Sequence, residues 1–527
     1  MDRTPVDIIV HHGKIYIVDS GFRTVEAMAI KDGKIIALGN NNDILLKYKA
    51  DEPIDAKGYP VFPGFIDAHA HFVGYAKSLF QVDLYDCKTW GEALARVKQF
   101  ADKNPNEKWI LGRGWDQNKF PGQAYPDNEE LSKLFPDKPV LLKRVDGHAA
   151  IANDCALNMA HVAATTKVEG GSVEMKGSKP SGVLIDNAVE LVSNLIPQNT
   201  LADYEKWLTQ AQINCFESGL TTVTDCGLMY YDISNLDSLQ KKGTIKMRVY
   251  AMLTDSAVNL DKYLEKGPYK TEYLYVKGVK AYADGALGSR GACLKQPYAD
   301  QPGHTGFLLS NYAHFDSLAA RLAKTDFQLC THAIGDSGNK VILDIYKKYL
   351  GGKNDKRWRI EHAQVVDPAD IHYFADFNVV PSVQPTHATS DAPWATARLG
   401  ENRMKGAYAY KTLLAQNGWM PLGTDFPVEG IQPVKTFISA VFRTDISGNP
   451  KNGFRKEEAL TREQAIRGMT IWAAKANCME KEIGSLEIGK RADFVILNID
   501  PMTATEEQAQ QIKPLTTFIG GSRVFGL

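Results

Sequence analysis

The chain has 527 residues, of which 44% are hydrophobic and 23% are charged. This length predicts one large domain and at least one smaller one, and the composition is that of a soluble globular protein. Lys and Arg (61) balance Asp and Glu (62), leaving a formal charge of −1 without a long run of one sign. Capture of nucleic acid or of an anionic membrane is therefore not expected. A small molecule is the expected partner, and assembly into a homo-oligomer is left open.

The seven cysteines are scattered and never stand in a CxxC pair. The sequence therefore predicts buried free thiols rather than a disulfide framework or a thiolate zinc site. The N-terminus lacks an apolar signal core, and no run of about 18 apolar residues follows it. As it stands, the sequence predicts a cytoplasmic protein, although a periplasmic chain whose signal peptide had been removed would look the same.

Both ends of the chain are predicted to form short β-strands. Residues 6–60 alternate apolar and polar positions between turn residues, with a hairpin signal at Asp32 and Gly33. Residues 483–500 and 516–527 show the same pattern with Gly-containing turns. We expect the two ends to pair into one small β domain, made of residues 1–60 and 476–527.

Residues 61–475 are predicted to form the large domain. The strand-like apolar segments between residues 61 and 425 are VFPGFIDAHAH, LTTVTDCG, KMRVYAML, YVKGVKAYADG, FQLCTHAIGD, RWRIEHAQ, NVVPSVQP and MPLGTDFP. Helical stretches such as 201–219 and 337–352 separate most of them, and strands that alternate with helices form parallel β/α units. Eight such units predict an α/β fold, the closed (β/α)8 TIM barrel. Residues 72–200, after barrel strand 1, are too many for a loop, so we predict a large insertion over the barrel mouth.

Two histidines end the first barrel segment, PGFIDAHAHF (63–72). Side chains alternate along a strand, so Asp67, His69 and His71 are predicted to share one face and the two imidazoles to converge. At the C-terminal end of a barrel strand, where such barrels hold their active sites, they would point at a common centre. A solitary histidine is more often a core or surface residue, but an HxH pair at this place favours a metal ion.

Further candidates end other strand segments: Lys280, His332, His362 and Asp425. Four imidazoles and one carboxylate suit zinc and exceed what one tetrahedral ion requires, so one ion or two are considered. Lys280 fits such a site only with a neutral amine or as a carbamate. The alternative is an ion pair with Asp284, which follows on the same face of the strand.

The ordered set of motifs resembles the amidohydrolase superfamily, and specifically its third family, which includes the N-substituted formamide deformylases. The motifs are PGFIDAHAHF, DGHAAIAN, EGGSVE, KAYADGALGSR, THAIGD, RIEHAQ, GTDFPVE and GSLEIGKRADFVIL. The likeness runs nearly end to end. It implies a (β/α)8 barrel flanked by a urease-like composite β-sandwich built from both chain ends.

The resemblance also implies two metal positions and a bridge between them. One ion would be held by His69, His71 and Asp425, the second by His332 and His362, and the bridge would be a carboxylated Lys280. Lys277 lies close by in the sequence, and some superfamily members work with a single ion. Both the bridge and the number of ions are therefore left open.

A divalent ion in such a site lowers the pKa of bound water and supplies hydroxide at neutral pH. Asp425 is predicted to accept a proton during attack on a carbonyl and to return it to the departing nitrogen, while His387 helps to polarise the carbonyl. The predicted activity is hydrolysis of a C–N bond, of the amide or N-substituted formamide type. The superfamily also holds deaminases, cyclic-amide hydrolases, esterases and lactonases, which are the alternatives.

Substrate contacts are predicted in the insertion and the loops, with Trp115, His148, Asp284 and Arg290 as candidates. Arg290 could bind a substrate carboxylate or form a structural ion pair. Two non-catalytic interpretations stay open: a binding or regulatory protein that kept the barrel, and a purely structural metal. Ligands from several different strand ends favour a catalytic site over a closed structural one.

Overall fold

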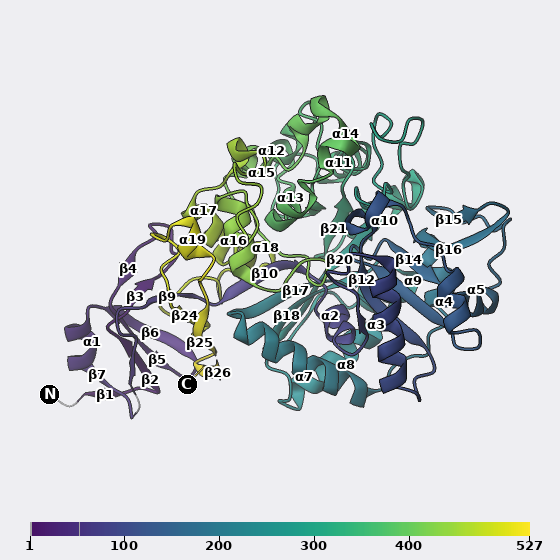
Figure 1. Cartoon of the computed structure of the whole chain (residues 1–527). Helices are drawn as coiled ribbons and strands as arrows, with labels where there is room; N and C mark the ends of the chain where they lie inside the picture. The colour runs from purple at the N-terminus through teal and green to yellow at the C-terminus, as the bar shows by residue number, and fades with distance from the viewer. Residues whose placement is uncertain (1–2, 52, 527) are drawn as a thin grey trace.

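Strands from both chain ends form a β-sandwich at one end of the molecule (Figure 1). The computed structural model describes residues 3–51 and 53–526. One sheet has the strand order β26-β25-β24-β9-β3-β4 and joins the two ends, and the other has the order β6-β5-β2-β8. Val10, Ile30, Val61 and Phe494 belong to one hydrophobic core that both sheets share. The predicted pairing of the two chain ends is confirmed.

The elements of this end region are short. They are β1 (Thr4–Pro5), β2 (Ile8–His11), β3 (Lys14–Tyr16), β4 (Thr24–Val25), β5 (Ala27–Lys31), β6 (Lys34–Gly39), α1 (Asn41–Lys47), β7 (Tyr48–Lys49), β8 (Ile54–Asp55), β9 (Pro60–Pro63), β24 (Phe494–Leu497), β25 (Pro514–Ile519) and β26 (Ser522–Phe525).

The chain passes from the sandwich into the barrel at a single residue, Gly64. β9 ends at Pro63 in the sandwich sheet, and the first barrel strand begins at Phe65. A Cβ at Gly64 would lie 2.3 Å from the side chain of Thr221, so only glycine lets the two parts approach this closely. The apolar segment that the sequence presents as one strand is thus two strands, one in each domain.

The large domain is a barrel of parallel strands in the order β10-β17-β18-β20-β21-β22-β23. The strands are rich in buried Val, Ile, Leu and Ala, as expected when helices cover a parallel sheet. Their bounds are β10 (Phe65–Ala70), β17 (Leu220–Leu228), β18 (Arg248–Thr254), β20 (Leu274–Tyr282) with β19 (Tyr269–Lys270) antiparallel at its side, β21 (Gln328–Ala333), β22 (Arg359–His362) and β23 (Val380–Ser382). The predicted α/β barrel is confirmed.

The last predicted segment, MPLGTDFP, closes the sheet without forming a regular strand. It lies between β23 and β10, where Gly423 N donates to Val383 O at 3.1 Å and Ala68 N donates to Leu422 O at 3.2 Å. Asp425 has a left-handed backbone (φ 63°), which ends the extended run. The barrel is therefore nearly closed, and its last segment turns sharply where it reaches the mouth.

The helices of the large domain follow the barrel strands and continue toward the C-terminus. They are α7 (Leu201–Glu217), α8 (Tyr230–Lys241), α9 (Ala257–Tyr263), α10 (Tyr312–Leu322), α11 (Asp336–Leu350), α12 (His372–Asp376), α13 (Pro385–Asp391), α14 (Ala395–Leu399), α15 (Tyr410–Asn417), α16 (Pro433–Val441), α17 (Arg462–Gly468), α18 (Ile471–Ala476) and α19 (Glu506–Ala509). α7 starts with a capping box between Thr200 and Asp203, and α11 ends at Gly351 in the left-handed conformation.

Residues after β10 fold into a separate layer with its own sheet, of order β11-β12-β13-β14-β16-β15. The chain first forms α2 (Phe72–Ser78), whose buried residues pack in the barrel core. The elements of the layer are β11 (Val82–Asp83), α3 (Trp90–Lys103), β12 (Ile110–Trp115), α4 (Glu129–Leu134), β13 (Val140–Arg144), β14 (Ala149–Ala152), α5 (Asp154–Met159), β15 (Gly171–Lys176), β16 (Lys179–Asp186) and α6 (Glu190–Ser193). We call this layer the insertion. It has hydrophobic cores separate from that of the barrel.

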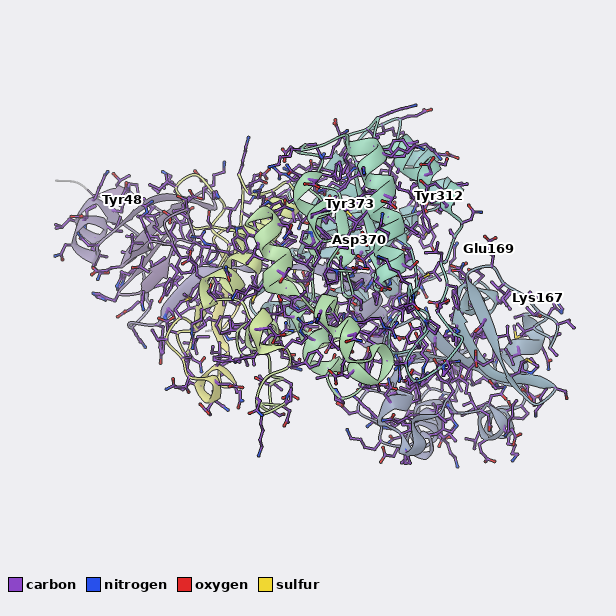
Figure 2. All side chains as sticks on the ribbon, turned by 90° about the horizontal axis from the view of Figure 1, so that it is seen from above. Tyr48, Lys167, Glu169, Tyr312, Asp370 and Tyr373 are labelled. Atoms are coloured by element: carbon purple, nitrogen blue, oxygen red, sulfur yellow. The ribbon has the colours of Figure 1, made fainter. Side chains whose placement is uncertain are left out.

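The insertion and the sandwich lie at opposite ends of the molecule, with the barrel between them (Figure 1). Figure 2 shows the same order from above, with Tyr48 in the sandwich, Tyr373 near the middle, and Lys167 and Glu169 in the insertion. Within residues 3–51 and 53–526, no helix has both the length and the apolar character needed to cross a membrane.

Candidate metal centre at the barrel mouth

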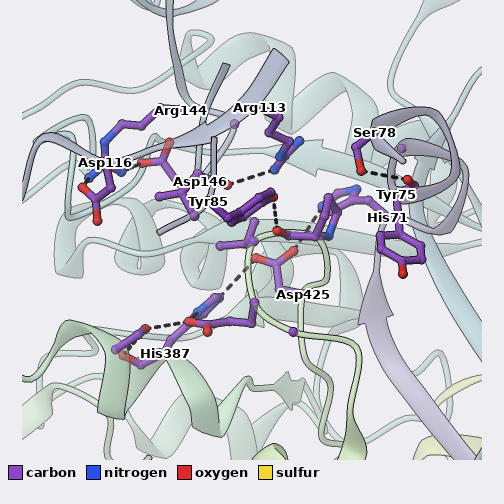
Figure 3. Close-up of a pocket in the computed structure, with 18 of the residues that line it drawn as sticks. His71, Tyr75, Ser78, Tyr85, Arg113, Asp116, Arg144, Asp146, His387 and Asp425 are labelled. Carbon is purple, nitrogen blue, oxygen red and sulfur yellow. Dashed lines mark hydrogen bonds and ion pairs between the residues drawn. The ribbon is translucent and has the colours of Figure 1, made fainter. Parts of the chain in front are cut away.

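His69 in the first barrel strand and His71 directly after it meet Asp425 of the closing segment, and Figure 3 shows His71 beside Asp425. Oδ1 of Asp425 lies 3.5 Å from Nε2 of His69 and 3.2 Å from Nε2 of His71. The backbones are also tied together, because Asp425 N donates to His69 O at 2.7 Å and His71 N donates to Phe426 O at 2.8 Å. The structure thus brings three of the predicted ligands to one point.

Asp67 does not join His69 and His71, although strict alternation would place all three on one face. The pairing of β10 with β17 shifts register between Asp67 and Ala70. Asp67 instead accepts hydrogen bonds from Thr424 N and Thr424 Oγ1, at 3.0 and 2.6 Å. Burial raises the pKa of Asp67 to about 7. This carboxyl fixes the closing segment against β10 and lies behind the site.

His332 and His362 lie beside this group, at the ends of β21 and β22. Their ring centroids are 4.5 Å apart, and the His362 ring is 4.6 Å from that of His69. Among the described residues, Nδ1 of His362 has no hydrogen-bond partner although it is buried. A left-handed backbone at His362 (φ 73°) lets consecutive residues of β22 both reach the barrel interior.

Lys280 reaches the same group from β20. Its Nζ lies 3.4 Å from Nε2 of His69, and its side chain is buried. Lys277 faces outward and donates to Asp326 O at 2.6 Å, so Lys280 is the lysine that lies at the centre. Burial lowers the pKa of Lys280, but Tyr282, Cys226 and Glu361 raise it more, and the net shift is upward.

Glu361 stands behind His69 and was not among the residues predicted from the sequence. Its Oε2 lies 2.6 Å from Nδ1 of His69. Burial raises the pKa of Glu361, but His69 and Arg359 lower it to about 2, so the carboxylate is ionised. An ionised partner at Nδ1 keeps the proton on that nitrogen and leaves Nε2 free to bind a metal.

Burial keeps the imidazoles that converge here neutral. It lowers the pKa of His71 to about 4 and the pKa values of His332 and His362 well below the usual range. Burial acts in the opposite direction on Asp425, but His69, His387 and His71 outweigh it and hold the pKa of this carboxyl well below its usual range. Neutral imidazoles and an ionised carboxylate are the forms that bind divalent ions.

His387 lies on the other side of Asp425. Its Nε2 is 3.2 Å from Oδ2 of Asp425, and its Nδ1 is 3.2 Å from Oε1 of Glu429. Burial lowers the pKa of His387, but these two carboxylates outweigh it and raise the pKa to about 10. His387 is therefore the protonated histidine of the group, held between two anions.

The model of the amidohydrolase family matches residues 52–525 of this chain. The chain belongs to the amidohydrolase family. Over 98% of its length it is 32% identical to Protein LONG AFTER FAR-RED 3 of Arabidopsis thaliana and 33% identical to the putative amidohydrolase YtcJ of Bacillus subtilis (strain 168), covering 91% and 99% of those chains. It is 25% identical to the N-substituted formamide deformylase of Arthrobacter pascens over 98% of its own length and 97% of that chain.

Among solved structures, an uncharacterized metal-dependent hydrolase from Pyrococcus horikoshii OT3 superposes on this amidohydrolase with a TM-score of 0.77. The two share 28% identity, and the match covers 95% of this chain and 99% of the other. With the family match, this places the protein among the metal-dependent hydrolases of the amidohydrolase superfamily.

The residues at the barrel mouth fit a divalent ion. His69, His71 and Asp425 form one group whose ligand atoms lie within 4.8 Å of one another, and His362 and His387 form a second group with Asp425. Within the described chain, Oδ1 of Asp425 and Nδ1 of His362 are buried atoms without a hydrogen bond. Buried polar atoms without partners are rare, and a metal would satisfy both.

A cavity of about 1020 Å³ lies over this group, between the barrel and the insertion. Lys280, His332, His362, His387 and Asp425 line it at the barrel end. His148 reaches it from the insertion, and its Nδ1 lies 2.6 Å from Oδ1 of Asp186.

The other predicted substrate residues lie outside the cavity. Trp115 is buried in the core of the insertion, where its indole donates to Leu142 O at 2.7 Å. Arg290 pairs with Asp300 at 3.0 Å. Asp284 is buried beneath His332, 3.7 Å from its Nε2, and accepts hydrogen bonds from the backbone of Cys293, Ile334 and Gly335. Of the four, the structure brings His148 to the cavity.

The insertion contributes polar residues that the sequence analysis did not single out. Arg144 lines the cavity and pairs with both Asp116 and Asp146, and its Nε donates to Gln117 at 2.7 Å (Figure 3). Arg113 of β12 also lines the cavity, and its neighbours Gly112 and Gly114 were the signal in the sequence, because glycine inside a strand often marks a place where a ligand or another backbone approaches closely. The wall of the cavity is therefore built from charged residues of β12 and β13.

Proposed function

We propose that this protein hydrolyses a C–N bond of a small molecule, of the amide or N-substituted formamide type. The observation that carries the proposal is the convergence of His69, His71 and Asp425 at the ends of barrel strands, beside two further buried histidines. The names of two relatives, a putative amidohydrolase and an N-substituted formamide deformylase, support this chemistry. Zinc is the ion that this set of imidazoles and carboxylate suits best.

When bound, such an ion lowers the pKa of a water molecule to about 7 and polarises a carbonyl oxygen. Asp425 would take the proton from the attacking water and pass it to the departing nitrogen, which would otherwise leave as an unstable amide anion. His387 is protonated and hydrogen-bonded to Asp425. It would orient this carboxylate and offer positive charge to the oxygen of the tetrahedral intermediate.

Lys280 would take part as a carbamate that bridges two ions, or as an amine beside one. The carbamate forms from a neutral amine, and the pKa of Lys280 is raised because Tyr282, Cys226 and Glu361 outweigh burial. Ion binding beside the ammonium would therefore have to favour loss of its proton. The number of ions that each chain holds decides between these forms.

The first test is metal content per chain, measured by mass spectrometry of wild type and Lys280→Ala prepared with bicarbonate and zinc. His12→Ala serves as the background for both, because His11, His12 and Asp55 form an exposed group that could hold an additional ion. About two ions falling to one or fewer in Lys280→Ala would support the bridged pair. About one ion in both would assign Lys280 a role as an amine in a single-ion site.

The second test is a panel of N-substituted formamides, N-acyl amino acids, lactams, purines and lactones, assayed before and after chelation. We expect turnover of one of the amide classes that chelation abolishes, with little change in the melting temperature. Turnover confined to purines or lactones would replace the proposal with a deaminase or a lactonase. If the protein bound no metal when supplied with zinc and turned over none of these compounds, the hydrolase proposal would be refuted.

A further inference from the structure

Arg113 of the insertion lines the cavity without a carboxylate partner. Its Nη2 donates to Val145 O at 3.1 Å, a neutral acceptor. Its Nε is buried and unpartnered among the described residues, and no ion pair with a described Asp or Glu is found. Gly147 lies against the guanidinium, since a Cβ there would stand 3.2 Å from Nη2. The loop after β13 therefore leaves room for this charge and does not neutralise it.

The other cations that the insertion presents to the cavity are neutralised. Arg144 is held by two aspartates, and Lys119 lies 3.4 Å from Oδ1 of Asp86. Buried charges are normally paired, because removing a charge from water is costly. Arg113 is an exception in the same sheet, because it lacks an ion pair with any described residue whereas Arg144 on the neighbouring strand has two.

A second cation strengthens the positive charge at this place. Lys143 of β13 pairs in register with Arg113 of β12, so the two side chains share a face of the parallel sheet. Within the described chain Lys143 also lacks an ion pair. Burial and then the charge of Arg113 lower the pKa of Lys143 to about 8. Lys143 therefore adds positive charge beside Arg113, and Arg113 is the one of the two that lines the cavity.

The guanidinium faces the candidate metal centre. Figure 3 shows Arg113 pointing from the insertion toward Tyr85 and His71. The hydroxyl of Tyr85 donates to the carbonyl of Pro427, which follows Asp425 closely in the chain. Gly114 makes this contact possible, because a Cβ there would lie 2.5 Å from the Tyr85 ring. Arg113 is thus fixed across the cavity from the groups that would perform the chemistry.

We propose that Arg113 binds a carboxylate of the substrate, which would make the substrate an N-acyl or N-formyl compound that carries a carboxylate. This rests on the proposed function and names its substrate class. Guanidinium binds a carboxylate through paired hydrogen bonds. Asp83, Asp116, Asp146 and Glu217 also line the cavity, so a monoanion is favoured over a dianionic phosphate. The role that the sequence analysis offered to Arg290 belongs in this proposal to Arg113.

The kinetic test compares N-acetylphenylalanine with its neutral amide, N-acetylphenylalaninamide, on metal-loaded enzyme. Wild type should favour the carboxylate, and Arg113→Met should lose this preference by about 10- to 100-fold in kcat/KM. Arg113→Lys should restore part of it, because lysine keeps the charge without the paired geometry. Lys119→Met is the matched control, a cavity cation that is already paired, and should keep the wild-type preference.

A binding measurement separates this inference from the proposed hydrolysis. Ligand-observed NMR titration of the metal-chelated protein with the same two compounds reports affinity without turnover and without an ion that could bind carboxylate. Tighter binding of the carboxylate to wild type, lost in Arg113→Met, supports the inference even if no hydrolysis is found. Equal affinity for both compounds in wild type, or a preference that survives in Arg113→Met, overturns it.

Discussion

The two ends of the cavity differ in how their charged groups are satisfied. At the barrel end, Asp425 and His362 leave buried atoms without hydrogen bonds among the described residues. On the insertion wall, Arg144 is saturated by Asp116, Asp146 and Gln117. The barrel end is therefore arranged for a ligand that brings its own charge, whereas most charged groups on the insertion wall already have hydrogen-bond and ion-pair partners within the wall.

This difference separates the chemistry from the selection of the substrate. Side chains at barrel strand ends are held by a rigid sheet, which suits groups that must act within a fraction of an ångström. The insertion is a separately folded layer, so its residues can change with little effect on the barrel. Losses at the barrel end should therefore remove chemistry, whereas losses of paired residues on the wall should remove stability.

The largest effect is expected for Asp425→Asn. Asparagine keeps the shape of the side chain but cannot accept and return a proton, so kcat should fall by about 100- to 10,000-fold. Metal content should stay near the wild-type value, because His69, His71, His332 and His362 are unchanged. Steady-state kinetics and metal analysis on the same preparation measure both quantities.

Glu217→Gln provides the control for this variant. Glu217 also lines the cavity, but it forms no ion pair with any described residue. Its kcat should stay within about threefold of wild type, the range of an exposed charge. Near wild-type turnover in Asp425→Asn would remove the proton shuttle from the mechanism, and equal losses in both variants would mean a general electrostatic effect of the cavity.

The next effect is on stability, for Arg144→Met on the insertion wall. Removing one partner of a buried ion pair costs about 3 to 5 kcal/mol, because Asp116 and Asp146 would face each other without a cation. Burial raises the pKa of Asp146, but Arg144 outweighs it and holds the pKa below the usual range in wild type. The stability that Asp146 contributes is therefore present at neutral pH and is lost only as the pH falls through its lowered pKa.

In Arg144→Met, Asp146 would instead titrate closer to neutrality, because burial raises its pKa and the opposing charge of Arg144 would be gone. The stability gap between the variant and wild type should thus narrow between about pH 7 and pH 5, where the variant gains protons and wild type does not. Thermal unfolding at both pH values measures it. A stability difference that is small, or that widens on acidification, would show that the ion pairs of Arg144 contribute little to the stability of the insertion.

Much of the fold could be predicted from the sequence because the patterns are local. Apolar strands alternating with helices predicted the parallel barrel, and similar hairpin patterns at both ends predicted the sandwich. The junction at Gly64 could not be seen, since residues 61–66 form one apolar run that continues from β9 of one sheet into β10 of another. The pairing of Arg113 with Lys143 depends on the register of two strands that a helix separates in the chain, so no local pattern reports it.

The candidate site was predictable where alternation holds and not where the backbone departs from it. His69 and His71 were found because they end one strand, but the register shift beside Asp67 turned that residue away. Glu361 was missed because alternation places it opposite His362, and only the left-handed backbone at His362 brings both inward. Lys277 and Lys280 lie in a strand that is apolar on both faces, so its pattern could not say which lysine faces the barrel interior.

The smallest effect is expected for Glu361→Gln, which leaves a hydrogen-bond acceptor near His69 but removes the charge. Loss of such a carboxylate behind a metal-binding histidine lowers metal affinity by about 10- to 100-fold. Competition with a chelator of known affinity measures this change. Lower affinity with kcat unchanged at saturating zinc is the expected result, because Glu361 acts on His69 and lies behind the reacting atoms.

Glu429→Gln is the matched variant, because Glu429 stands behind His387 as Glu361 stands behind His69. If His387 binds substrate and not metal, Glu429→Gln should lower kcat and leave metal affinity near the wild-type value. If both variants lost affinity equally, His387 would be a metal ligand, as its grouping with His362 and Asp425 permits. The stabilisation of the carbonyl oxygen would then have to come from the metal and the backbone.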